Sequence, residues 1–186
     1  MSDLDGKARL EVAGKVAEFD VLQGTDGTPA IDVATLMRQT GHTALDYGFV
    51  NTSATKSAIT FIDGDKGILR YRGYPIEQLA KHSSYLETAW LLIYGELPSE
   101  SELSDFDNRI RRHTLLHEDL KRFFTALPHS AHPMSVLSAA TAALSTYYEN
   151  ESDPSNPEHV ELNTIRMLAK LPVIAAYAHK KSVGQA

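Results

Sequence analysis

Hydrophobic and polar residues follow two different periods along this chain, and the first is that of β-strands. Residues 10–12 and 16–21 alternate apolar and polar side chains on either side of Gly14, which is the pattern expected of strands joined by a turn. Glycine and proline residues that favour turns follow directly. Residues 31–37 then predict one short helix, which we expect to end at Gly41. The start of the chain is therefore predicted to form a small β module.

A second hairpin is predicted shortly before the middle of the chain. β-branched and aromatic residues dominate residues 57–62 and 68–71, and the residues between them include two glycines, which accept the positive φ angles of a tight reversal. Gly73 and Pro75 stop the second strand. Because proline fits the first turn of a helix, Pro75 is expected to begin one that runs through Ala80.

Helical spacings of three and four residues dominate the rest of the chain. Two capping boxes mark helix starts: Ser84 with Glu87, and Ser99 with Glu102, each pair a hydroxyl with a carboxylate three residues later. The first of these two helices is expected to end at Gly95. The pattern predicts that helices make up most of the structure.

Four further helices are expected beyond these. They cover residues 120–127, the stretch from Pro133 through Tyr148, residues 160–169, and the stretch from Pro172 through Lys181. Pro172 is expected to separate the last two, because a proline inside a helix lacks the N–H donor and clashes with the preceding turn. The predicted fold class is mainly α, with a β-rich module over residues 1–55 and a multi-helix portion over residues 56–186.

Composition limits the classes of function. The 186 residues are 42% hydrophobic and 23% charged, with a net charge of −6, so the chain has no basic excess of the kind that binds nucleic acid. It has no apolar run long enough to span a membrane and no secretory leader at its start. The absence of cysteine excludes disulfides and thiolate metal sites. We therefore expect a cytoplasmic protein with neither nucleic acid nor membrane as a partner.

One block of sequence identifies a family. Residues 57–80 read SAITFIDGDKGILRYRGYPIEQLA, and this block resembles the citrate synthase family, in the bacterial type with a β-rich N-terminal extension. The resemblance continues at residues 85–87, 92–98, 112–118, 132–137 and 180–185, so it covers almost the whole chain. It implies that residues 56–186 are a multi-helical portion of the citrate synthase large domain.

The resemblance also implies an activity. Citrate synthases are acyltransferases that condense acetyl-CoA with oxaloacetate to citrate and CoA in the tricarboxylic acid cycle. An aspartate base, histidines that stabilise the enol and polarise the oxaloacetate carbonyl, and carboxylate-binding arginines perform this chemistry in the family. The family segments that carry them, such as His-Ala-Asp-His-Glu and Gly-Pro-x-His-Gly-Gly-Ala-Asn, do not occur here. We therefore expect a truncated family member that contains no catalytic residue and is inactive alone.

An alternative is a non-catalytic fragment that acts as an oligomerisation scaffold or binds a nucleotide effector. The resemblance implies a homo-oligomer, a dimer or a hexamer, or assembly with the missing C-terminal half, and it implies no cofactor. Family helices from this portion pack against that half and against a second subunit, so exposed apolar residues are expected to drive association. The residues expected to lose partners are Trp90, Phe123, Phe124, Leu144 and Ile174.

Cationic and aromatic residues on three predicted helical segments form a candidate effector site. Such groups suit the phosphates and the base of a nucleotide, and by resemblance their positions match the allosteric NADH site of hexameric bacterial relatives. They are Arg112, His113, Thr114, Tyr148, Arg166 and Lys170. One departure is Leu115, where those relatives commonly have methionine. The alternative is a solvated cationic surface whose residues pair with carboxylates, namely Glu118, Glu149 or Glu161.

Two pairs of histidines have spacings compatible with a shared metal ion. They are His113 with His117, and His129 with His132. Neither pair has a third ligand at a suitable spacing, and Glu118 follows His117 without completing a His-Glu-x-x-His motif. We predict no metal site and expect these histidines to pack against helices or to cap them.

Overall fold

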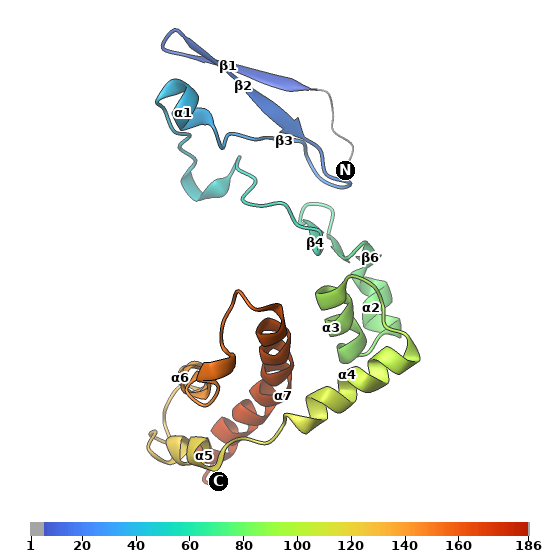
Figure 1. The fold of residues 1–186 in the computed structure, drawn as a ribbon, viewed down its shortest axis with the longest axis vertical. Coiled ribbons are helices and arrows are strands. Elements are labelled where there is room, and N and C mark those ends of the chain that lie inside the picture. Colours follow the sequence, from blue (N-terminus) through green and yellow to red (C-terminus); the bar gives the residue numbers. More distant parts are fainter. Residues whose placement is uncertain (1–5, 186) are drawn as a thin grey trace. The chain divides into compact units, whose positions relative to one another are not determined.

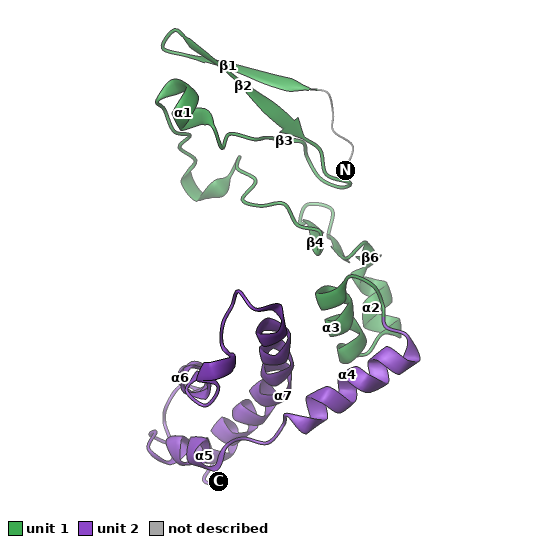
Figure 2. Ribbon diagram, viewed as in Figure 1, with its two compact units in different colours: residues 1–97 green, residues 98–186 purple. Residues whose placement is uncertain are grey.

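The protein is mainly helical and has two small antiparallel sheets. The computed structural model describes residues 6–185 and divides into two compact units, residues 1–97 and residues 98–186 (Figure 2). Both sheets lie in the first unit, whereas helices and their connections make up the described residues of the second. The predicted fold class is confirmed. The boundary expected after residue 55 lies inside the first unit and stays a prediction.

The first sheet forms the start of the chain (Figure 1). Its three antiparallel strands are adjacent in the order of the sequence: β1 (Lys7–Val12), β2 (Lys15–Leu22) and β3 (Ala30–Ile31). Ala13 and Gly14 connect the first two strands with φ angles of 51° and 77°, as a two-residue hairpin turn requires. Ala17 and Phe19 share one face of β2 and are buried with Leu36. The predicted β module is therefore present.

The short helix of this module lies later than expected. Helix α1 spans Leu36–Thr40, whereas the sequence predicts a helix over residues 31–37. Ile31 instead pairs with Val21 in the sheet, and the carboxylate of Asp32 accepts a hydrogen bond from the N–H of Ala34 at 3.0 Å. The strand pairing keeps this stretch extended, and the helix begins only after it. Its predicted end is confirmed, since Gly41 caps it with φ 79°.

The second sheet contains the predicted hairpin. Its strands are β4 (Thr60–Asp63), β5 (Ile68–Tyr71) and β6 (Tyr74–Pro75). The first strand starts at Thr60 because the hydroxyl of Ser57 accepts hydrogen bonds from the N–H groups of Ile59 and Thr60, at 3.1 and 3.2 Å, and so holds a turn there. Arg72 and Gly73 form the β5–β6 turn with positive φ angles. The guanidinium of Arg72 donates to the carbonyl of Leu92 at 2.9 Å, which ties this turn to a helix.

Two helices complete the first unit, α2 (Ile76–His82) and α3 (Tyr85–Tyr94). The capping box at the start of α3 is confirmed, because the N–H of Ser84 donates to Glu87 at 2.6 Å and the N–H of Glu87 donates to Ser84 at 3.3 Å. Hydrogen bonds from Ser84 to the carboxylate, first of all the one from its backbone N–H, lower the pKa of Glu87. Gly95 ends the helix with φ 97°, as predicted.

The second unit is a helical assembly with its own apolar core. Its elements are α4 (Glu100–Arg112), α5 (Glu118–Thr125), α6 (Pro133–Ser145), a short 3₁₀ helix η2 (Glu149–Glu151) and α7 (Pro157–Ser182). Helix α7 packs against α4, α5 and α6, and α5 packs against α6. The buried core comprises Leu116, Leu120, Phe124, Val136, Ala140, Leu144, Ile174 and Ala178.

The break expected at Pro172 is absent from the described helix. Helix α7 continues through it, so the two helices predicted on either side are one. Pro172 removes one donor to the carbonyl of Leu168. However, its own side chain is exposed, while Ile165 and Ile174 on either side of it are both buried. Burial of side chains both before and after Pro172 keeps the two halves in one helix.

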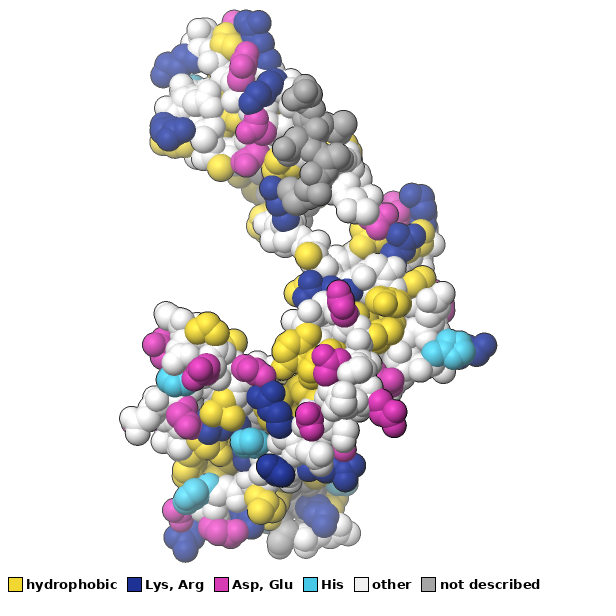
Figure 3. Space-filling model, turned by 45° about the vertical axis from the view of Figure 1, so that its right-hand side comes forward, with side chains coloured by type: hydrophobic (Ala, Val, Ile, Leu, Met, Phe, Trp, Pro, Cys, Tyr) yellow, Lys and Arg dark blue, Asp and Glu magenta, His cyan; other side chains and the backbone are white. Residues whose placement is uncertain are grey.

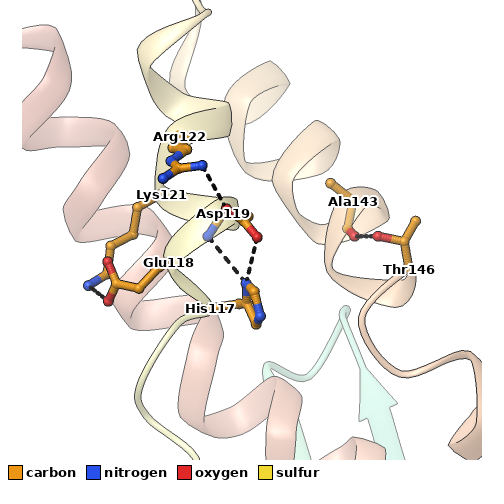
Figure 4. Close-up of polar contacts among 7 residues, drawn as sticks. All are labelled: His117, Glu118, Asp119, Lys121, Arg122, Ala143 and Thr146. Atoms are coloured by element: carbon orange, nitrogen blue, oxygen red, sulfur yellow. Dashed lines mark hydrogen bonds and ion pairs between the residues drawn. The ribbon is translucent and has the colours of Figure 1, made fainter.

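Tyr148 lies outside the helix in which the sequence places it. Helix α6 ends at Ser145, where the hydroxyl of Ser145 donates to the carbonyl of Ala142 at 2.7 Å. The hydroxyl of Thr146 donates to the carbonyl of Ala143 at 2.8 Å (Figure 4). These side chains bond carbonyls of the last turn. Tyr148 therefore sits in the connection between α6 and η2.

Apolar exposure differs from the expectation. Phe124, Leu144 and Ile174 are buried within the second unit, so the expectation that they lose their partners is wrong. Phe123 and Trp90 are half-buried, and both contact another aromatic ring, Phe124 and Tyr94 respectively. The most exposed apolar residues lie elsewhere, among them Leu45, Tyr47, Phe49, Val50 and Leu115. Association of the isolated chain stays a prediction.

Charged side chains of both signs cover the surface. In the view of Figure 3, acidic and basic residues are interspersed over both units, in keeping with a net charge of only −6. Within residues 6–185, none of the helices has both the length and the apolar character needed to cross a membrane.

Candidate functional site

The structure brings together three of the six predicted effector-site residues. Arg166 and Lys170 lie one turn apart on α7, and Tyr148 reaches them from the connection after α6. The guanidinium carbon of Arg166 lies 3.9 Å from the centroid of the Tyr148 ring, and the Nζ of Lys170 lies 6.0 Å from it. Two cations therefore converge on one aromatic ring, a favourable cation–π arrangement.

Arg166 is buried, with 7% of its surface exposed. Its Nη2 forms an ion pair with the carboxylate of Glu151 in η2, and its Nη1 donates to Oδ1 of Asn163 at 3.2 Å. Its Nε is also buried, and no partner for it is present among the described residues. The guanidinium is therefore held in place through two of its three nitrogens.

Lys170 is buried more deeply, with 3% of its surface exposed. Its Nζ donates to the carbonyls of His113 and Leu115 at 2.7 and 2.5 Å. These carbonyls follow the C-terminal end of α4, where a cation also interacts favourably with the helix dipole. Burial, and secondarily the nearby charge of Arg166, lower the pKa of Lys170. The ammonium thus connects α7 to the end of α4 without a carboxylate partner among the described residues.

The remaining three predicted residues lie at the end of α4. Arg112 is its last residue and is exposed, and no hydrogen bond or ion pair is formed by its side chain within residues 6–185. The Nδ1 of His113 lies 2.8 Å from the carbonyl of Arg109, and the hydroxyl of Thr114 donates to the carbonyl of Arg111 at 2.9 Å. The side chains of His113 and Thr114 are therefore turned back to α4, and the backbone of His113 reaches Lys170.

The alternative of a solvated cationic surface is wrong for Arg166 and Lys170, because both are buried. Two of the three expected carboxylate partners are also engaged elsewhere. Glu118 pairs with Lys121 at 2.5 Å (Figure 4), and Glu161 pairs with Arg109 at 2.7 Å. These two pairs join exposed or half-exposed side chains.

The acidic partner of the site, Glu151, was missed by sequence reasoning, as was Asn163. The contact of Asn163 with Arg166 could have been predicted from the sequence, since the two residues are three positions apart on the same helix and such pairs lie on one face. The contact of Glu151 with Arg166 could not have been predicted in this way, because Glu151 lies outside α7. With two cations and one carboxylate, the described site carries an excess of positive charge in a buried position. It is therefore suited to an anionic ligand.

The histidines follow the predicted capping role. The Nδ1 of His117 accepts a hydrogen bond from the N–H of Asp119 at the start of α5 (Figure 4), and the Nδ1 of His132 accepts one from the N–H of Met134 at the start of α6, both at 3.2 Å. His129 bonds the carbonyl of Lys181 through Nδ1 at 2.8 Å. No three His, Cys, Asp or Glu side chains in the described part of the chain are placed to hold a metal ion.

A separate pocket of about 130 Å³ lies at the C-terminal end of α7. Apolar side chains such as Phe124, Leu127 and Val136 line it together with His129 and His179. None of the six predicted effector-site residues contributes to this lining.

Comparison with known proteins gives consistent matches. The family model described as "Citrate synthase, C-terminal domain" matches residues 48–186. Citrate synthase 1 of Mycobacterium tuberculosis (strain ATCC 25618 / H37Rv) is 56% identical over 185 residues, which are 100% of this chain and 43% of that relative. Citrate synthase of Corynebacterium glutamicum is 42% identical over 180 residues, which are 97% of this chain and 41% of that relative.

A solved structure agrees with these sequence matches. The crystal structure of citrate synthase from Pyrobaculum aerophilum matches with a TM-score of 0.67 and 34% sequence identity, and the match covers 90% of this chain and 40% of that one. The chain therefore spans less than half the length of the relatives that it matches.

Proposed function

The chain belongs to the citrate synthase family, and from this premise we propose that it supplies the N-terminal portion of a citrate synthase. The complete enzyme would join the methyl carbon of acetyl-CoA to the carbonyl carbon of oxaloacetate. Water would then hydrolyse the thioester, which releases citrate and CoA in the cytoplasm. The observation that carries this proposal is the 56% identity to citrate synthase 1 of M. tuberculosis over the whole chain. Acetyl-CoA and oxaloacetate are the proposed substrates, and no cofactor is proposed.

We further propose that the 186 residues do not catalyse the condensation alone. The proton-abstracting and carbonyl-polarising groups expected for the family are carried by segments that the sequence does not contain. The chain would contribute a helical scaffold and would act with a C-terminal portion, or within a dimer or hexamer.

The test is release of free CoA from acetyl-CoA and oxaloacetate, followed with a thiol reagent. The chain contains no cysteine and adds no thiol signal of its own. We expect no turnover by the chain alone, and turnover when the C-terminal portion of the M. tuberculosis relative is added. That portion alone and the intact relative serve as the negative and positive controls.

Turnover that scales with the purified chain alone would contradict the proposed inactivity. Failure of the two portions to restore turnover, while the intact relative is active, would contradict the proposed catalytic partnership. The second candidate function, binding of a nucleotide effector, would then be the role left to this chain.

The nucleotide-effector function rests on a specific observation. Two buried cations converge on the ring of Tyr148, with Arg166 at 3.9 Å and Lys170 at 6.0 Å from its centroid. We propose that this site, together with Arg112, His113 and Thr114, binds NADH. The cations would bind its phosphates, and the aromatic ring would offer a stacking surface.

Arg112 offers a sharp test because its side chain is exposed and its loss should not disturb the core. Its neighbour Arg111 is the matched control, since it lies in the same helical turn and pairs with Asp107 at 2.8 Å on the surface. In a fluorescence titration with NADH, Arg112→Ala should raise the Kd by about tenfold, as expected for loss of a charge-assisted hydrogen bond. Arg111→Ala should leave the Kd unchanged. Equal effects of the two variants would argue against a direct role of Arg112.

A further inference from the structure

We propose that Glu151 is an internal competitor of the anionic ligand, so that the site opens to a phosphate group only when the Glu151–Arg166 ion pair separates. This inference rests on the proposed nucleotide site and concerns its regulation. The carboxylate of Glu151 bonds Nη2 of Arg166. It therefore occupies an edge of the guanidinium that a phosphate would use, because both anions bind that group through the same donors.

The two partners of this ion pair differ in their freedom to move. The side chain of Arg166 is 9% exposed, whereas that of Glu151 is 46% exposed. Arg166 is also held by Asn163 and lies over the ring of Tyr148. Separation of the pair should therefore move Glu151 into solvent and leave Arg166 in place, where its Nε is buried without a partner among the described residues.

The backbone of η2 can remain in position while the Glu151 side chain moves. The backbone carbonyl of Glu151 accepts a hydrogen bond from Nδ2 of Asn163 at 2.6 Å, and the N–H of Glu151 donates to the carbonyl of Tyr148 at 3.0 Å. The hydroxyl of Ser152 also donates to the carbonyl of Tyr148 at 2.6 Å. Displacement thus requires rotation of one side chain and not unfolding of the segment.

The competition also selects the class of ligand. An entering anion must replace a carboxylate already paired with Arg166, and it gains from the excess positive charge of Lys170 only if it carries more negative charge than that carboxylate. A pyrophosphate group meets this requirement, because it carries several charges and many acceptor oxygens. A single carboxylate gains nothing from the exchange. The site should therefore prefer polyphosphates over monocarboxylates.

The experiment measures binding of inorganic pyrophosphate and, separately, of NADH by isothermal titration calorimetry at fixed ionic strength. It compares the unchanged chain with Glu151→Gln, which removes the competing charge but keeps an oxygen that accepts from Arg166. Glu149→Gln is the matched control, since Glu149 lies in the same short helix, is exposed and changes the net charge equally. Glu151→Ala provides a second variant, and thermal melting establishes that each variant is folded.

We expect Glu151→Gln to bind pyrophosphate about tenfold more tightly than the unchanged chain, which corresponds to about 1.4 kcal/mol. Glu149→Gln should change the Kd by less than about twofold, because an exposed charge interacts weakly through water. Equal gains in the two variants would show a general charge effect and overturn the inference. Acetate should bind to none of the proteins.

The two probes separate this inference from the proposed nucleotide function. If pyrophosphate binding tightens in Glu151→Gln but NADH binds to no protein, the internal competition stands and the NADH function falls. If NADH binds with equal affinity to the unchanged chain and to both Glu151 variants, the nucleotide function stands and the competition is overturned. If neither probe binds to a folded Glu151 variant, both are overturned.

Discussion

Replacement of Lys170 by methionine should lower the free energy of unfolding by about 2 kcal/mol. The ammonium of Lys170 donates to the carbonyls of His113 and Leu115, at 2.7 and 2.5 Å, and holds the end of α4 against α7. Methionine cannot donate, so each carbonyl loses a hydrogen bond from a charged group, which is worth about 1.5–3 kcal/mol.

An opposing effect reduces this loss. The unchanged protein buries an ammonium beside Arg166, and these are the two causes that lower the pKa of Lys170. Lys170→Met removes both the buried charge and its repulsion with Arg166, and this partly offsets the loss in the free energy of unfolding. Methionine also retains an unbranched apolar stem, which limits any cavity. We expect the loss of two charge-assisted hydrogen bonds to exceed the gain, which leaves the net value of about 2 kcal/mol.

The assay is urea unfolding followed by far-ultraviolet circular dichroism. Lys180→Met is the matched control, because Lys180 lies on the same helix and is exposed. It should change the free energy of unfolding by less than about 0.5 kcal/mol. An unchanged or increased stability of Lys170→Met would refute the reasoning, since the cost of burying the ammonium would then exceed the value of its hydrogen bonds. Lys170 would in that case destabilise the fold, as expected of a residue kept for a ligand.

Three other predictions follow from the fold. Phe124→Ala should lower the free energy of unfolding by about 3–5 kcal/mol in urea, because the ring is buried in the core of the second unit; a loss below about 1 kcal/mol would mean that this core is not formed. Pro172→Ala should raise it by about 1 kcal/mol or more, since the carbonyl of Leu168 regains a helical donor; a neutral or destabilising effect would indicate that α7 is interrupted there. Hydrogen bonds from Ser99 lower the pKa of Glu102 below its usual 4.5 in the folded state, so its stabilising contribution is present above pH 4.5 and disappears as the pH falls through the lowered pKa. The stability difference between the unchanged chain and Glu102→Gln in thermal melts should shrink over that range, and a difference that is constant with pH would contradict the role of the capping box.

The sequence alone determined features that depend on residues close together in the chain. The two capping boxes, the turn at Gly14 and the helix ends at Gly41 and Gly95 all follow from side chains or φ angles within a few positions of each other. Such interactions do not depend on distant parts of the chain, and they can therefore be predicted from the sequence. The block over residues 57–80 identified the family for a related reason, since its turns and strands fix a particular spacing of glycine, proline and apolar residues.

Only the tertiary structure decided which local preferences prevailed and which charges met. Helix α7 continues past Pro172, because the burial of side chains before and after the proline outweighs one missing hydrogen bond. The tertiary structure buried Arg166 and Lys170, and it gave Arg166 a partner from outside its helix, Glu151. Packing and electrostatics sum over neighbours in space, and those neighbours come from separate helices. The spacing of residues along the sequence therefore does not predict which of these residues become neighbours.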